Sequence, residues 1–84
     1  MVDLDKARRI LADLKDPSDP EIPTVDVCAL LEACGCESEE EESVVVYMHP
    51  DEDRLTFSVD RGYNSLPRRQ WEFLESMVSG FLDR

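Results

Sequence analysis

Positively charged residues are scarce in this 84-residue sequence compared with negatively charged ones. It contains 9 Lys and Arg residues against 20 Asp and Glu residues, which gives a formal net charge of −11. Residues 16–53 include no Lys or Arg at all, yet they hold 13 acidic residues. A protein that binds nucleic acid directly needs a positive surface to neutralise phosphates, so direct nucleic-acid binding is disfavoured. We expect instead that the middle of the chain forms a negative surface.

Long apolar runs, secretion signals and glycine-rich loops are also missing. No stretch approaches the roughly 18 apolar residues that span a bilayer, so we expect no membrane segment. Residues 1–5 have neither the basic nor the apolar region of a secretory signal. We therefore expect a cytoplasmic protein whose 3 cysteines are free thiols. The 3 glycines are isolated, which argues against a Gly-rich phosphate loop.

The first half of the chain has the pattern of two helices. Apolar residues at helical spacing predict a first helix over residues 3–15, with Asp3 as its N-cap. Residues 16–23 contain three prolines and are predicted to be a stiff connector. A second apolar stripe predicts a helix over about residues 25–34, which Gly35 ends by adopting a left-handed conformation.

The second half has the pattern of strands followed by a helix. The β-branched and aromatic run 44–48 predicts a strand, and residues 49–53 predict a hairpin loop. Residues 55–59 alternate between apolar and polar, as in a half-buried strand, and a final amphipathic helix begins near Pro67. We therefore expect one domain over residues 1–84 of the α+β class. It should have a small antiparallel sheet of two or three strands packed against helices.

This order of elements and the run 43–50 resemble the HicA (YcfA-like) toxin family, which has a small double-stranded-RNA-binding-domain-like fold. The matching residues are Leu30, Leu31, Gly35, Ser43, Tyr47, His49 and Pro50. The resemblance implies an α-β-β-β-α core over residues 24–84, preceded by an extra N-terminal helix. It also implies a first strand over residues 36–41, against the poor strand propensity of that acidic run.

The positions that carry the family's activity are altered. The family's ribonuclease activity needs a strand histidine that moves a proton on the RNA. Val44 and Val45 occupy the histidine positions here, and valine cannot transfer a proton. Basic residues that would hold RNA phosphates are replaced by residues 39–41, all glutamates. We expect no enzymatic activity. A divergent HicA-type mRNA interferase, paired with a HicB-like antitoxin, is the alternative.

Cysteine and histidine spacing does not favour a metal centre. Cys28 and Cys34 lie six residues apart on one predicted helix and face different ways. Cys36 is close to Cys34 but lacks the paired Cys-x-x-Cys pattern of a zinc site. We expect no metal and no cofactor. If a hairpin turns near Glu42, Cys36 would neighbour His49 as a nucleophile–base pair. That pair has no third group to orient it, so we expect His49 to be a structural residue at a strand end.

These observations predict a non-catalytic protein that binds a basic protein surface. In one version it is a nucleic-acid mimic, whose carboxylates imitate phosphates and inhibit a nucleic-acid-binding protein. In another, the acidity is an adaptation to a salt-rich cytoplasm, and the domain has a structural role only. The residues predicted to contact the partner are Glu37, Glu39, Glu40, Glu41, Glu42, Asp51, Glu52 and Asp53.

Overall fold

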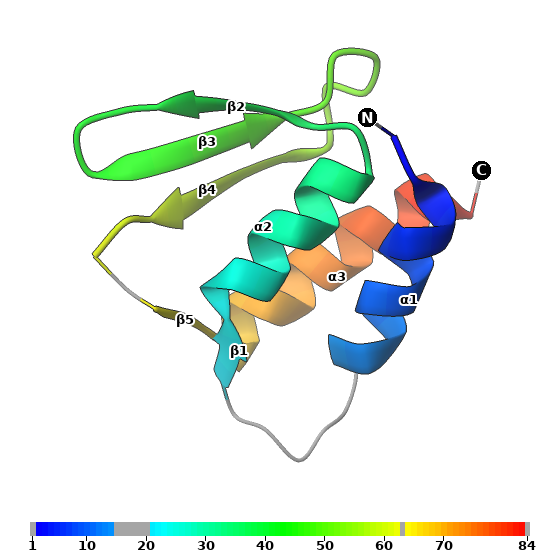
Figure 1. Ribbon diagram of the computed structural model, residues 1–84, viewed down its shortest axis with the longest axis horizontal. Coiled ribbons are helices and arrows are strands. Elements are labelled where there is room, and N and C mark those ends of the chain that lie inside the picture. The colour runs from blue at the N-terminus through cyan, green and yellow to red at the C-terminus, as the bar shows by residue number, and fades with distance from the viewer. Residues whose placement is uncertain (1, 15–20, 63, 84) are drawn as a thin grey trace.

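The computed structural model describes residues 2–14, 21–62 and 64–83 (Figure 1). These residues form three helices and five short strands, which confirms the α+β class. In chain order the elements are α1 (Leu4–Leu14), β1 (Glu21–Pro23), α2 (Thr24–Ala33), β2 (Glu37–Glu40), β3 (Val44–Met48), β4 (Thr56–Asp60), β5 (Ser65–Pro67) and α3 (Arg68–Leu82). A three-stranded sheet, β2 to β4, between α2 and α3 is compatible with a small HicA-like or double-stranded-RNA-binding-domain-like fold. None of these helices is long and apolar enough to cross a bilayer.

The larger sheet is an antiparallel meander in the order β2-β3-β4. Its central strand, β3, supplies the three valines and the tyrosine that favour extended structure. β2 consists of Glu37, Ser38, Glu39 and Glu40, all exposed, and it forms one edge of the sheet. The strand expected from the family resemblance is therefore present, because pairing with β3 overrides the low propensity of the acidic run.

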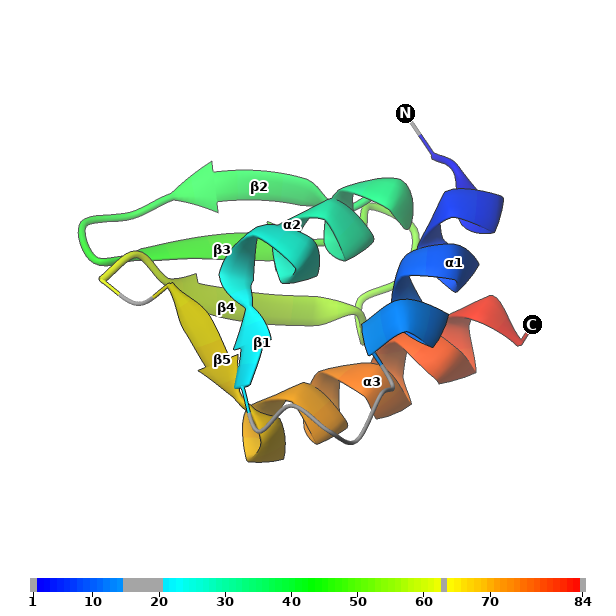
Figure 2. The same cartoon turned by 60° about the horizontal axis from the view of Figure 1, so that its bottom comes forward.

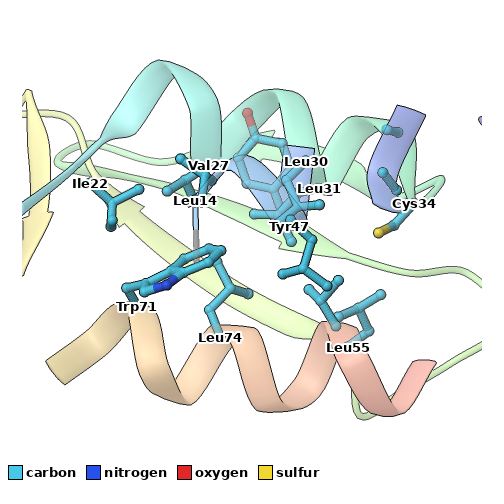
Figure 3. Packing of buried hydrophobic residues seen from close by; sticks show 14 of the residues in the cluster. Leu14, Ile22, Val27, Leu30, Leu31, Cys34, Tyr47, Leu55, Trp71 and Leu74 are labelled. Carbon is cyan, nitrogen blue, oxygen red and sulfur yellow. The ribbon is translucent and has the colours of Figure 1, made fainter. Parts of the chain in front are cut away.

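The three helices lie on one side of this sheet and enclose the core with it (Figures 1 and 2). Tyr47 and Val59 are the buried residues of β3 and β4, and they meet Leu30 of α2 and Leu74 of α3 in one cluster. Trp71 is fully buried near the start of α3, beneath α2 (Figure 3). Each fully buried side chain of this size contributes about 1.5–3 kcal/mol of transfer free energy. None of the described helices covers the opposite side of the sheet (Figure 1).

A second, two-stranded sheet was not expected from the sequence. Residues 16–23 were predicted to be a connector throughout, but Glu21–Pro23 forms β1 and pairs with β5. Ile22, only 2% exposed, lies opposite the buried Leu66, and this apolar pair explains why the segment is extended. Proline is tolerated at the ends of such short edge strands. The rest of the predicted connector, residues 16–20, lies outside the described residues.

The turns into α1 and out of α2 follow the predicted chemistry. The Asp3 carboxylate accepts a hydrogen bond of 3.1 Å from the Lys6 amide, as expected for an N-cap. Gly35 has a φ of 95°, the left-handed conformation predicted for the end of α2. This turn directs the chain from the buried Cys34 straight into β2, so it fixes where the acidic strand begins.

Candidate interface on the acidic sheet edge

The register of β2 against β3 decides which way each glutamate faces. Residues directly opposite in an antiparallel ladder share a face of the sheet. Glu39 pairs with Val46 and therefore lies on the side away from the helices. Glu40 pairs with Val45, which packs against the core, and so lies on the helix side. The strand thus presents negative charge on both faces of one sheet edge.

The side away from the helices combines apolar and acidic residues. We call it the outer face. It consists of Glu37, Glu39, Val44, Val46, Met48, Thr56, Ser58 and Asp60, by the pairing of the three strands. The three β3 residues form an apolar stripe, of which Met48 is 49% exposed. Glutamates of β2 border this stripe on one side, and polar residues of β4 border it on the other.

Glu41 and Glu42 lie in the turn that joins β2 to β3. The Glu41 amide donates a hydrogen bond of 2.8 Å to the Val44 carbonyl, which closes the hairpin near Glu42 as predicted. The Arg61 guanidinium donates to the backbone carbonyl of Glu41 at 3.3 Å. Both glutamate side chains are exposed. The backbone of the turn is therefore held in place while its carboxylates face water.

Asp51, Glu52 and Asp53 lie in the loop between β3 and β4, at the other end of β3. The Asp51 amide donates a hydrogen bond of 3.1 Å to Nδ1 of His49. The Leu55 amide closes the loop by donating to the Glu52 carbonyl at 3.0 Å. The four residues of β2 lie between this loop and the acidic turn, and each adds about 3.4 Å along the strand. The eight predicted residues therefore form a row along one edge with a loop at its end, rather than one compact cluster.

The carboxylates of β2 and its turn form no ion pair with Lys or Arg in the part of the chain that the structure describes. Within residues 2–14, 21–62 and 64–83, no ion pair involves Glu37 or any of the glutamates at 39–42. By contrast, Arg8 on α1 lies 3.7 Å from the Asp5 carboxylate. The edge of β2 is therefore a surface of uncompensated negative charge on a defined backbone.

The arrangement of Cys36 and His49 does not support a nucleophile–base pair. Nδ1 of His49 accepts the Asp51 amide, so the neutral ring carries its proton on Nε2, the other nitrogen. Burial raises the pKa of the Cys36 thiol to about 11, which keeps it protonated and unreactive near neutral pH. The His49 ring also lies 4.9 Å from the ring of Phe81. These contacts agree with the expected structural role of His49 at a strand end.

Other titratable groups near β2 are held in their neutral forms. Burial raises the pKa of Cys34 to about 12, with a smaller contribution from the charge of Cys36. The pKa of Tyr47 is also well above its usual value, mainly because of burial and then because of its hydrogen bond with Cys28. All three cysteines are free. Among the described residues, no group of three or more His, Cys, Asp or Glu side chains could hold a metal ion.

A groove that the sequence did not reveal adjoins the start of β2. It has a volume of about 580 Å³ and lies between the beginning of α1, the second half of α2 and Glu37. Asp3 and Glu32 also line it, together with the cationic Lys6. Its lining comes from two separate stretches of sequence, residues 2–6 and 29–37, which is why no local pattern indicated it.

Comparisons with protein-family models, with curated proteins and with solved structures gave no match for this chain. Membership of the HicA family therefore stays a prediction. The two positions that would carry the family's histidines hold Val44, half-buried on the outer face, and Val45, which packs against the core. Neither side chain offers a proton donor or acceptor at the sheet.

Proposed function

We propose that this protein is a non-catalytic binding protein whose acidic sheet edge docks on a basic surface of another protein. The observation that carries this proposal is the row of exposed glutamates along β2 and its turn, which form no ion pair with any residue that the structure describes. Because the backbone of β2 is fixed by its ladder with β3, little conformational freedom is lost on binding. Electrostatic complementarity would then supply both the rate of association and the choice of partner.

The partner class that fits this edge best is a nucleic-acid-binding protein of the cytoplasm. Dense positive surfaces serve to neutralise phosphates, and a regular row of carboxylates offers such a surface an alternative to the nucleic-acid backbone. In this role the protein is an inhibitor that acts by mimicry. The free cysteines fit a reducing compartment, where disulfides are rare.

Two alternatives have weaker support. A divergent HicA-type mRNA interferase with a HicB-like antitoxin is favoured by the order of elements alone. Val44 and Val45 cannot transfer a proton, and the Cys36–His49 pair lacks an available base. A purely structural, salt-adapted domain would explain the net charge of −11. It would not explain why the longest stretch without Lys or Arg, residues 16–53, also holds 13 of the 20 acidic residues.

Capture and competition together test the proposed function. The immobilised protein is incubated with lysate of the cells that produce it, at about 0.15 M and about 1 M salt, where the Debye length falls from about 8 to about 3 Å. Retained proteins are identified by mass spectrometry and then challenged with duplex RNA and DNA. We expect a basic protein that is held only at low salt and is displaced by nucleic acid. Retention of no protein, or of one that nucleic acid fails to displace, would contradict mimicry.

A further inference from the structure

The hydrogen-bond pattern of the hairpin shows which backbone groups of β2 face outward. The bond from the Glu41 amide to the Val44 carbonyl marks these two residues as a hydrogen-bonded pair. Such pairs alternate along an antiparallel ladder, so the next one joins Glu39 to Val46. Ser38 and Glu40 lie between the bonded positions, and their N–H and C=O groups therefore point away from β3.

The hydrogen bonds between β3 and β4 lead independently to the same conclusion about which backbone groups of β2 face outward. The His49 amide donates to the Leu55 carbonyl at 3.1 Å, and the Arg61 amide donates to the Ser43 carbonyl at 3.0 Å. Odd-numbered residues of β3 are thus bonded to β4, which leaves even-numbered ones for β2. The donors and acceptors of Ser38 are consequently directed outward from an edge whose side chains are all exposed.

The open edge continues into the groove at the start of β2. Glu37 belongs to both, as the first residue of the strand and as part of the groove lining. The groove has apolar walls from Val2 and Ala29, and it carries the carboxylates of Asp3 and Glu32 beside them. An extended segment lying along β2 toward Glu37 would enter this groove with its terminal residue.

We propose that the partner binds by adding an extended, Lys- or Arg-rich strand to the open edge of β2, with one end of that strand in the groove. This proposal takes the positive charge of the partner from the proposed function. It adds how the partner binds, namely by pairing with an open strand edge. Basic side chains would face Glu39 on the outer face and Glu40 on the helix side. A second copy of β2 is excluded as occupant, because it would place glutamate against glutamate.

Matched peptides test strand addition on the intact protein. The probe is a short, end-capped peptide of alternating Lys and Val. Its control has the same sequence and charge, but alternate backbone nitrogens are methylated. We expect the methylated peptide to bind about tenfold more weakly, because outward hydrogen bonds are lost. With the unmodified peptide, the amide signals of Ser38 and Glu40 should shift and exchange more slowly in NMR spectra.

A variant pair tests the same edge from the protein's side. Ser38→Pro removes one outward amide and keeps the charge of the strand, and proline is tolerated where an edge N–H faces solvent. Ser38→Ala keeps the amide and loses only the hydroxyl. We expect Ser38→Pro to weaken binding of the peptide about tenfold and Ser38→Ala to leave the affinity unchanged. Trp71 fluorescence reports whether each variant is folded.

The outcomes separate the two proposals. If both peptides bind equally and salt releases both, the edge attracts basic partners by charge alone. Strand addition is then wrong and the proposed function stands. If the unmodified Lys-Val peptide does not bind, strand addition is also wrong. The same holds if a peptide of alternating Glu and Val binds as tightly as the Lys-Val peptide. Should Ser38→Pro fail to fold, the methylated peptide on the unaltered protein decides the question.

Discussion

Ser38, exposed on the edge of the sheet, lies directly across the β2–β3 ladder from Tyr47, whose side chain is buried. A slip of one residue would place Glu37 or Glu39 opposite Tyr47 and turn its carboxylate toward the helices. Such a register would bring a charge toward the apolar core, which is unfavourable. The burial of Tyr47 therefore fixes which glutamates reach the outer face.

Replacing Tyr47 by Phe tests how much its buried hydroxyl contributes. The hydrogen bond with Cys28 would be lost while the ring keeps filling the core. We expect the free energy of unfolding to fall by about 1 kcal/mol. Tyr47→Ala should lower it by about 3–5 kcal/mol, because an aromatic cavity is left. Urea unfolding followed by Trp71 fluorescence measures both changes, and equal effects of the two substitutions would contradict this interpretation.

Two glycines should respond to alanine in opposite ways. Gly35→Ala forces a side chain into a φ of 95° and places its Cβ 2.6 Å from Val2 Cγ2. We expect a loss of about 1–2 kcal/mol in unfolding free energy. Gly80 lies within α3, and an added Cβ meets no atom within 4 Å. Gly80→Ala should stabilise the protein by about 0.5–1 kcal/mol. Thermal unfolding of the two variants measures both changes in stability. Changes of the same sign in the two variants would contradict this prediction.

Stability should fall in alkaline solution because of the buried thiols. The pKa of Cys34 rises from its usual 9.0 to about 12 in the folded protein. As the pH rises, the unfolded chain therefore loses the Cys34 proton before the folded protein does. The contribution of this thiol to the free energy of unfolding is complete below about pH 9 and declines as the pH rises toward the folded pKa. Cys36 acts in the same direction, with a pKa of about 11.

Urea unfolding under reducing conditions, at about pH 8 and about pH 10.5, measures this decline. Cys34→Ala is the control, since it removes the thiol with the largest shift and should flatten the pH dependence. If the unfolding free energy of the unaltered protein is the same at both pH values, the thiols are not shielded as described.

Neutralising the acidic row should not harm the fold. Glutamates at positions 39–42 are neighbours of like charge without ion pairs among the described residues. Changing them to Gln should leave the unfolding free energy unchanged or raise it by about 0.5 kcal/mol, and should reduce its dependence on salt. Unfolding at low and at high salt measures this. A large loss of stability at either salt would show that these carboxylates serve the structure and not a partner.

Local sequence patterns predicted the elements whose stabilising contacts are close in sequence. The α1 cap at Asp3, the end of α2 at Gly35 and the valine-rich β3 follow from short-range chemistry. The pairing of Ile22 with Leu66 could not be found in this way, because it joins segments far apart in the chain. A proline-rich segment indicates a connector unless its distant partner is known.

The candidate site was predictable in composition but not in arrangement. The excess of acidic residues between positions 16 and 53 can be read from the sequence alone. Its division between two faces of β2 depends on the register that Tyr47 sets. The groove beside Glu37 depends on how α1 packs against α2, which no local pattern encodes. Contacts between residues far apart in the chain therefore set both the orientation of the glutamates and the groove, on which the two proposals depend.

The most direct test of the account compares two charge-reversed variants that have the same net charge. One variant reverses acids of the β2 edge and its turn, namely Glu37→Lys, Glu39→Lys, Glu40→Lys and Glu42→Lys. The other reverses acids on or after the helices, namely Asp13→Lys, Glu72→Lys, Glu75→Lys and Asp83→Lys. Binding of each to the captured basic partner is titrated at about 0.15 M salt. We predict that the edge variant loses about a hundredfold in affinity and the helix variant almost none. Equal losses, or full binding by the edge variant, would contradict the assignment of the β2 edge as the binding surface.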